Sequence, residues 1–125
     1  MRNRIPGFTM IELLVALAII ATLLTLAAPR YLGGITKAQD DVLRENLYSL
    51  RQAIDHYYAD RGKYPKELAD LVTDKYLRKI PVDPVTSSNV SWVVIPPDNP
   101  ALGGVFDIKS SAPGKGLDGT YYQTW

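Results

Sequence analysis

The sequence predicts an α+β fold in which one long N-terminal helix packs on a small, three-stranded antiparallel sheet. The first observation is an apolar run from Phe8 to Ala28 that contains a single charged side chain, Glu12. The second is a series of apolar residues between Leu43 and Tyr57, spaced by three and four positions. The third is a C-terminal region of short β-prone segments, separated by turns rich in Pro, Gly and Asn.

Composition narrows the classes of function. The 125 residues include 14 Lys and Arg against 13 Asp and Glu, so the basic excess that binds phosphates is missing and no nucleic-acid partner is expected. The absence of cysteine excludes disulfides, thiolate metal sites and cysteine nucleophiles. The single His56 argues against histidine-rich zinc sites and Ser-His-Asp catalysis. We therefore predict no enzymatic activity, no catalytic residue and no metal ligand.

The apolar run is long enough to cross a membrane. A helix over residues 8–28 rises about 30 Å, which matches the hydrocarbon core of a bilayer. Arg2 and Arg4 precede it without any acidic residue. Because positively charged flanks stay in the cytoplasm, the sequence predicts a single-pass helix with a cytoplasmic N-terminus and an exported C-terminal region.

Three interpretations of this run compete. A secretory signal would be cut after Ala27 or Ala28, but the run is long for such a signal and Pro29 would adjoin the cut. A plain membrane anchor explains the length but not Glu12, because a carboxylate inside a spanning helix costs about 2.5–3.5 kcal/mol. The third interpretation uses the residues on both sides of Phe8.

The string Gly-Phe-Thr-Met-Ile-Glu from Gly7 to Glu12, behind a short basic leader, resembles the class III signal of type IV pilins and pseudopilins. The resemblance implies that residues 1–7 are a leader peptide. A prepilin peptidase would cleave between Gly7 and Phe8 and methylate the new Phe8 amine. It further implies that Glu12 pairs with the Phe8 amine of a neighbouring subunit during assembly. Pro29 lies where this family places a proline, and we expect a helix break there.

Electrostatics supports the role that the resemblance implies for Glu12. A carboxylate without a partner is penalised in a low dielectric, and an amine partner relieves the penalty. Such a pair favours one axial stagger between neighbouring helices. The alternative is an interfacial carboxylate that reaches water without any partner.

The chain after the apolar run has a different pattern. Residues 8–28 form the transmembrane and assembly half of the predicted helix, and residues 29–62 form an amphipathic half that ends near Gly62. One stripe of this second half is apolar and is expected to face a folded domain. Its members are Leu43, Leu47, Leu50, Ile54 and Tyr57.

Residues 63–125 are predicted to form a periplasmic region of loops and sheet. We expect a short helix or turn over residues 66–73, and then strands at Val90–Ile95, Val105–Lys109 and Thr120–Thr124. The Tyr-Leu-x-x-Ile-Pro-x-Asp-Pro string from Tyr76 to Pro84 and the closing segment resemble the G-type pseudopilins of type II secretion systems. The fold that this resemblance implies is pilin-like.

The closing loop contains two motifs that suggest ligands. Gly114–Gly119 reads Gly-x-Gly-x-x-Gly, but dinucleotide binding needs a helix after the glycines and too few residues follow. Typical G-type pseudopilins bind calcium here through two aspartates. Asp118 matches the first, whereas Tyr121 or Tyr122 stands near the second. Because one carboxylate suits a hard cation poorly, we predict no cofactor, with calcium near Asp118 as the alternative.

The resemblance implies a structural subunit of a type II secretion pseudopilus that supports protein export across the outer membrane. The expected partners are copies of the chain or other pseudopilins, a prepilin peptidase and an inner-membrane assembly platform. The expected location is the bacterial inner membrane, followed by the filament. The alternative is a type IV pilin or minor pilin in a surface fibre for adhesion, motility or DNA uptake; the lack of cysteine favours the pseudopilin. A membrane-tethered periplasmic enzyme and a free secreted binding domain are the other classes considered.

Overall fold

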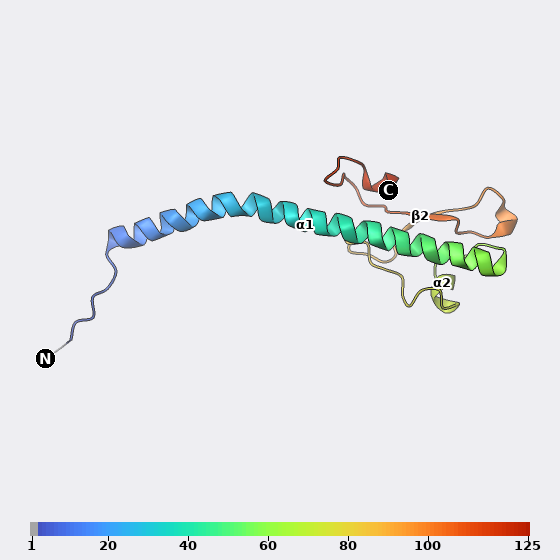
Figure 1. The fold of residues 1–125 in the computed structure, drawn as a ribbon, viewed down its shortest axis with the longest axis horizontal. Helices are drawn as coiled ribbons and strands as arrows, with labels where there is room; N and C mark the ends of the chain where they lie inside the picture. The colour runs from blue at the N-terminus through green and yellow to red at the C-terminus, as the bar shows by residue number, and fades with distance from the viewer. Residues whose placement is uncertain (1–2) are drawn as a thin grey trace. The chain divides into compact units, whose positions relative to one another are not determined.

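The computed structural model describes residues 3–125, so Met1 and Arg2 of the predicted leader lie outside the described residues. The chain divides into two compact units, one that ends at Ile35 and one from Thr36 to Trp125. The helix α1 (Met10–Arg61) contributes to both (Figure 1). The remaining elements belong to the second unit and are α2 (Asp70–Thr73), β1 (Val93–Ile95), the 3-10 turn η1 (Pro100–Leu102), β2 (Asp107–Lys109) and the 3-10 turn η2 (Tyr122–Thr124). The divisions at residues 28 and 62 stay predictions.

The first unit is mostly helix, and its side chains are not packed into a core. All described residues up to Ile35 are exposed. Polar groups within this stretch are satisfied locally, since the Thr22 and Thr25 hydroxyls each donate to the carbonyl four residues earlier at 2.8 Å. The helix surface therefore remains almost wholly apolar and needs lipid or other helices around it.

The predicted helix break at Pro29 is wrong, because α1 continues through this residue. Proline has no amide hydrogen to offer the Thr25 carbonyl, and this loss costs about 3 kcal/mol in a helix interior. The hydrogen-bonded turns on both sides are long enough to keep the helical conformation. Pro29 consequently removes one hydrogen bond without ending the helix.

The core of the second unit forms around the predicted apolar stripe of α1. Leu43, Leu47, Leu50 and Ile54 are buried, as the spacing predicts, and Tyr57 packs at the edge of the core. Their partners come from the chain that follows the helix: Leu71, Trp92, Val105, Ile108, Ala112 and Tyr122. Burial of each large aliphatic side chain favours folding by about 1.5–3 kcal/mol, so the stripe holds the sheet region on the helix.

The sheet has two strands instead of the three predicted. β1 and β2 pair antiparallel, with Val94 opposite Ile108. The third predicted strand, Thr120–Thr124, is wrong: only Tyr121 makes an isolated bridge, to Lys115, and η2 follows. The Tyr122 side chain of this segment is bonded to Asp40 of α1, a contact that a local β-propensity does not include, as described below. The α+β class itself, a long helix with a small antiparallel sheet, is confirmed.

One buried carboxylate organises the connection to the sheet. Asp83 is fully buried, and its Oδ1 accepts hydrogen bonds from the amides of Val85 and Thr86 at 2.9 and 3.2 Å. Its Oδ2 accepts from the Ser110 hydroxyl at 2.5 Å. Asp83 thus ties the proline-rich connection to the chain just after β2, and this long-range role was not predicted.

Candidate functional site: the N-terminal segment and the C-terminal loop

The residues of the predicted processing site lie just before α1. Gly7 and Phe8 have no helical or strand conformation, and the Phe8 side chain is 87% exposed. No atom lies within 4 Å of the position that a Cβ on Gly7 would occupy. A peptidase needs an unobstructed peptide bond outside helix and strand to bind its substrate, and the Gly7–Phe8 bond meets this need.

Glu12 has a local structural role that the sequence analysis missed. The Glu12 amide donates to the Thr9 hydroxyl at 3.1 Å, and the Glu12 carboxylate accepts from the Thr9 amide at 3.4 Å. This reciprocal pair is a capping box, which satisfies amides that the start of a helix leaves unbonded. The Thr-x-x-Glu spacing from Thr9 could have revealed it. No cation within residues 3–125 forms an ion pair with Glu12.

The segment that follows Glu12 can reach across a bilayer. Among the described residues, α1 is the one helix long and apolar enough to do so. None of the most apolar window is buried inside the structure. Gly7 and Phe8 lie just before this helix and Glu12 lies in its first turn, whereas Pro29 lies near the end of its apolar half.

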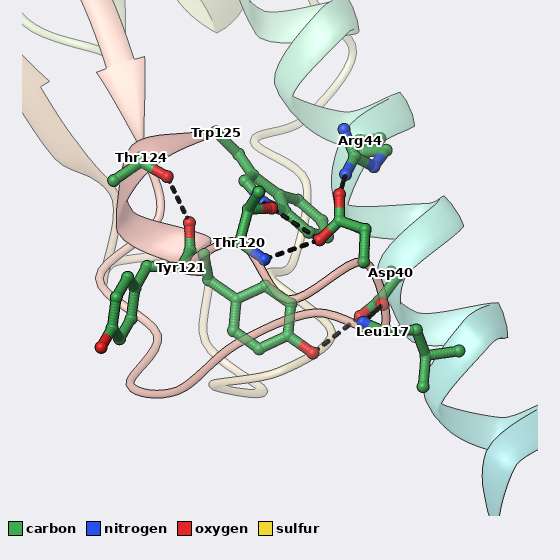
Figure 2. Close-up of polar contacts among 9 residues, drawn as sticks. Asp40, Arg44, Leu117, Thr120, Tyr121, Thr124 and Trp125 are labelled. Atoms are coloured by element: carbon green, nitrogen blue, oxygen red, sulfur yellow. Dashed lines mark hydrogen bonds and ion pairs between the residues drawn. The ribbon is translucent and has the colours of Figure 1, made fainter.

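A second group of interacting side chains joins α1 to the C-terminal loop, which we define as residues 113–125. Figure 2 shows Asp40 and Arg44 of α1 directed to this loop. The Arg44 guanidinium donates to Asp118 Oδ2 at 2.6 Å and lies 3.8 Å from the centre of the Trp125 ring. Asp118 Oδ1 accepts from the amide and the hydroxyl of Thr120 at 2.9 and 2.6 Å. These bonds, those from Thr120 first, lower the pKa of the Asp118 carboxyl.

Asp40 anchors the same loop from a buried position. Its two carboxylate oxygens accept from the Tyr122 hydroxyl at 2.7 Å and from the Leu117 amide at 2.8 Å. The hydrogen bond to Asp40, followed by burial, raises the pKa of Tyr122 to about 12. A Cβ on Gly116 would lie 2.4 Å from the Trp125 ring, so only glycine lets the loop approach this closely.

These contacts provide a test of whether the loop suits calcium. Calcium takes six to eight oxygen ligands whose lone pairs point to the ion. Each of the four carboxylate oxygens of Asp40 and Asp118 accepts a hydrogen bond from the protein instead. Residues 3–125 contain no group of three or more His, Cys, Asp or Glu side chains that could hold a metal. The donor set of this loop does not fit the ion.

Within residues 3–125, the glycine motif of the loop and His56 also lack the surroundings that a ligand site needs. Gly114 and Gly119 have positive φ angles of 93° and 83°, which turns of this loop require, and the only helical turn after them, η2, has three residues. No helix N-terminus is therefore available for a pyrophosphate. His56 is exposed on α1, with no metal-ligating cluster in the described part of the chain.

Comparison with known proteins gives the family. Residues 2–28 match the family model of the prokaryotic N-terminal methylation motif. The chain is 31% identical over 130 aligned residues to type II secretion system core protein G of Pectobacterium carotovorum subsp. carotovorum, which covers 91% of this chain and 79% of the relative. The chain belongs to the type II secretion system core protein G family. No solved structure matches it.

The chain is also similar to two further relatives. Core protein G of Escherichia coli (strain K12) is 27% identical, with 86% of this chain and 81% of the relative covered. Fimbrial protein EcpC of Eikenella corrodens is 29% identical, with 67% of this chain and 58% of the relative covered. The matches to core protein G thus extend well beyond the apolar half of the helix.

Proposed function

We propose that the chain is a structural, non-enzymatic subunit of a type II secretion pseudopilus. The observation that carries this proposal is the relationship to core protein G over 91% of the chain, in combination with the N-terminal methylation motif. The fold agrees with such a role, because an exposed apolar helix half is joined to a folded unit that has its own core. The proposed location is the inner membrane, with the N-terminus in the cytoplasm and the second unit in the periplasm.

Processing by a prepilin peptidase is the first step that we propose. The peptidase cleaves between Gly7 and Phe8, removes the leader and methylates the Phe8 amine. The accessibility of this bond supports the step, since Phe8 is exposed and Gly7 has no side chain to obstruct an active site. Cleavage produces a new amine four residues before Glu12.

Assembly through Glu12 is the second proposed step. The Glu12 carboxylate of one subunit pairs with the Phe8 amine of the next subunit at an inner-membrane assembly platform. The next subunit is a copy of this chain or another pseudopilin. Within residues 3–125 the carboxylate has no cationic partner, and a cation from a neighbour would remove the penalty of an unpaired charge in an apolar medium. The capping box orients this carboxylate at the start of the helix.

N-terminal analysis of the membrane-bound protein tests the proposal. Mass spectrometry of the native chain should give a first residue of N-methylated Phe8, followed by Thr9 and Met10, and no leader. In a strain without the chain, proteins normally exported across the outer membrane should accumulate in the periplasm. A soluble product that begins at Pro29 or Arg30, with export unaffected, would replace the proposal by a secreted domain.

A surface fibre is the second candidate, supported by the similarity to fimbrial protein EcpC. It shares the processing and assembly steps, so the two candidates differ only in phenotype. If the deletion strain loses surface fibres, adhesion or motility while protein export continues, the pilin function replaces the pseudopilin function.

A further inference from the structure

We infer that the guanidinium of Arg44 is the cation that neutralises Asp118 in the C-terminal loop, and that this loop keeps its conformation without a metal ion. The inference concerns the second unit alone and goes beyond the proposed role in a filament. It follows from three features of the loop: where its charges lie, what occupies the carboxylate oxygens, and how the Trp125 ring is held.

The carboxylate of Asp118 in the loop already has a positive charge beside it. Asp118 is the acidic residue of the segment from 113 to 125, and its carboxylate lies 2.6 Å from a guanidinium nitrogen of Arg44. Arginine stays protonated throughout the physiological pH range, so the group beside Asp118 keeps its positive charge at every pH in that range. A divalent cation at the same carboxylate would have to displace or face that charge.

The oxygens of the loop are already used. Asp118 Oδ1 receives two hydrogen bonds from Thr120, and Asp118 Oδ2 receives one from Arg44. The second carboxylate in the neighbourhood, Asp40, receives an amide and a phenol hydrogen. A metal would compete with these donors for the same oxygens, and the buried Asp40 and Tyr122 would lose bonds that burial leaves hard to replace.

The guanidinium also does what a metal could not, because it stacks on an aromatic ring. Arg44 lies over Trp125 at 3.8 Å from the ring centre, and the Trp125 indole N–H donates to the Thr120 hydroxyl at 2.6 Å. Thr120 in turn donates to Asp118. Arg44, Asp118, Thr120 and Trp125 therefore form a closed circuit, in which Arg44 supplies the link to α1.

A calcium titration of the full-length chain in detergent micelles tests the metal-free conformation. We expect the Tm of the second unit, followed by near-UV circular dichroism, to agree within about 1 °C in calcium and in chelator. For a domain of this size, calcium at 100 times its Kd would raise the Tm by about 10 °C or more. A saturable rise of this kind overturns the inference.

Limited trypsin digestion tests the role of Arg44. Lys115 is exposed inside the loop, so cleavage after Lys115, quantified by mass spectrometry, reports loop opening. Arg44→Gln should speed this cleavage about tenfold, since it removes an ion pair and a cation–π contact together. The control Arg78→Gln should leave the rate unchanged, because Arg78 is exposed and forms no ion pair within residues 3–125.

A second variant tests the same contact without a substitution in α1. Asp118→Asn changes the loop end of the contact and should also speed cleavage after Lys115. The double variant with Arg44→Gln should be cleaved no faster than the faster single variant, because both remove the same link. Cleavage at the wild-type rate in both single variants, or fully multiplicative rates in the double variant, contradicts the inference.

Discussion

The Tyr122 hydroxyl donates a hydrogen bond to the carboxylate of Asp40, which lies 82 positions earlier in the sequence. Tyr122 is 5% exposed and Asp40 equally buried, so neither group can turn to water when its partner is removed. A hydrogen bond to a charged acceptor contributes about 1.5–3 kcal/mol to the free energy of unfolding. A buried acceptor left without its donor adds to the loss. At this scale the loop depends on a few polar contacts with specific partners.

The first prediction concerns the hydroxyl of Tyr122. Tyr122→Phe keeps the ring but leaves one oxygen of Asp40 without its donor, so we expect the free energy of unfolding to fall by about 2–3 kcal/mol. Urea unfolding of the full-length chain in detergent measures this change. Tyr121→Phe is the matched control, since Tyr121 is exposed, and it should cost less than about 0.5 kcal/mol. Equal effects of the two substitutions would contradict the assigned role.

The second prediction concerns alkaline pH. The pKa of Tyr122 is raised from 10.0 to about 12, chiefly by the hydrogen bond to Asp40. A group with a higher pKa in the folded state stabilises that state below the unfolded pKa and stops doing so as the pH rises through the folded pKa. The stability difference between wild type and Tyr122→Phe should therefore shrink between about pH 10 and pH 12. Urea unfolding at stepwise pH measures it, and a constant difference over this range speaks against the hydrogen bond.

The third prediction belongs to the scale of the elements. Leu50 lies in the buried stripe of α1, and Leu50→Ala should lower the free energy of unfolding of the second unit by about 2–5 kcal/mol through the cavity it leaves. Val42 is 48% exposed on the same helix, so Val42→Ala should cost less than about 1 kcal/mol. Thermal or urea unfolding compares them; similar losses would mean that the stripe does not form the core.

How far the elements could be predicted depended on how local their signals are. The helix was expected over residues 8–62 and is observed from Met10 to Arg61, because amphipathic spacing and the flanking glycine act over a few residues. The prediction of a third strand was wrong because the conformation around Tyr122 depends on its hydrogen bond to Asp40, which is distant in sequence. The predicted helix break at Pro29 was wrong because a long helix tolerates one missing hydrogen bond.

The candidate sites divide in the same way. Gly7, Phe8 and Glu12 could be proposed from the sequence because the N-terminal methylation motif is a contiguous string, and their roles stay predictions. The loop contacts could not, since Arg44 and Asp118 are separated by 74 residues and no spacing rule connects them. Only the positions of Asp40 and Arg44, one helical turn apart on α1, hinted that they share a face.

The fourth prediction concerns the whole molecule and its assembly. Glu12→Ala should leave cleavage after Gly7 intact but reduce filament formation strongly, since it removes the proposed partner of the Phe8 amine. Glu12→Gln separates charge from structure, because glutamine still completes a capping box with Thr9. We expect Glu12→Gln to assemble as poorly as Glu12→Ala, whereas Thr9→Ala keeps the charge and assembles. Filament yield after shearing measures all three variants; normal assembly of Glu12→Gln would leave Glu12 with a capping role alone.

The central claim is that the apolar helix halves of neighbouring subunits contact one another in the membrane. Disulfide cross-linking measures this contact most directly. The chain contains no cysteine, so one cysteine introduced at Leu14 and one at Ala18 of the same chain would be the sole thiols available. If subunits stack side by side, oxidation of membranes should produce a ladder of dimers and higher multimers of the processed chain, which Glu12→Gln diminishes. A processed chain that stays monomeric under oxidation, or that is recovered in soluble form without residues 8–28, contradicts the account.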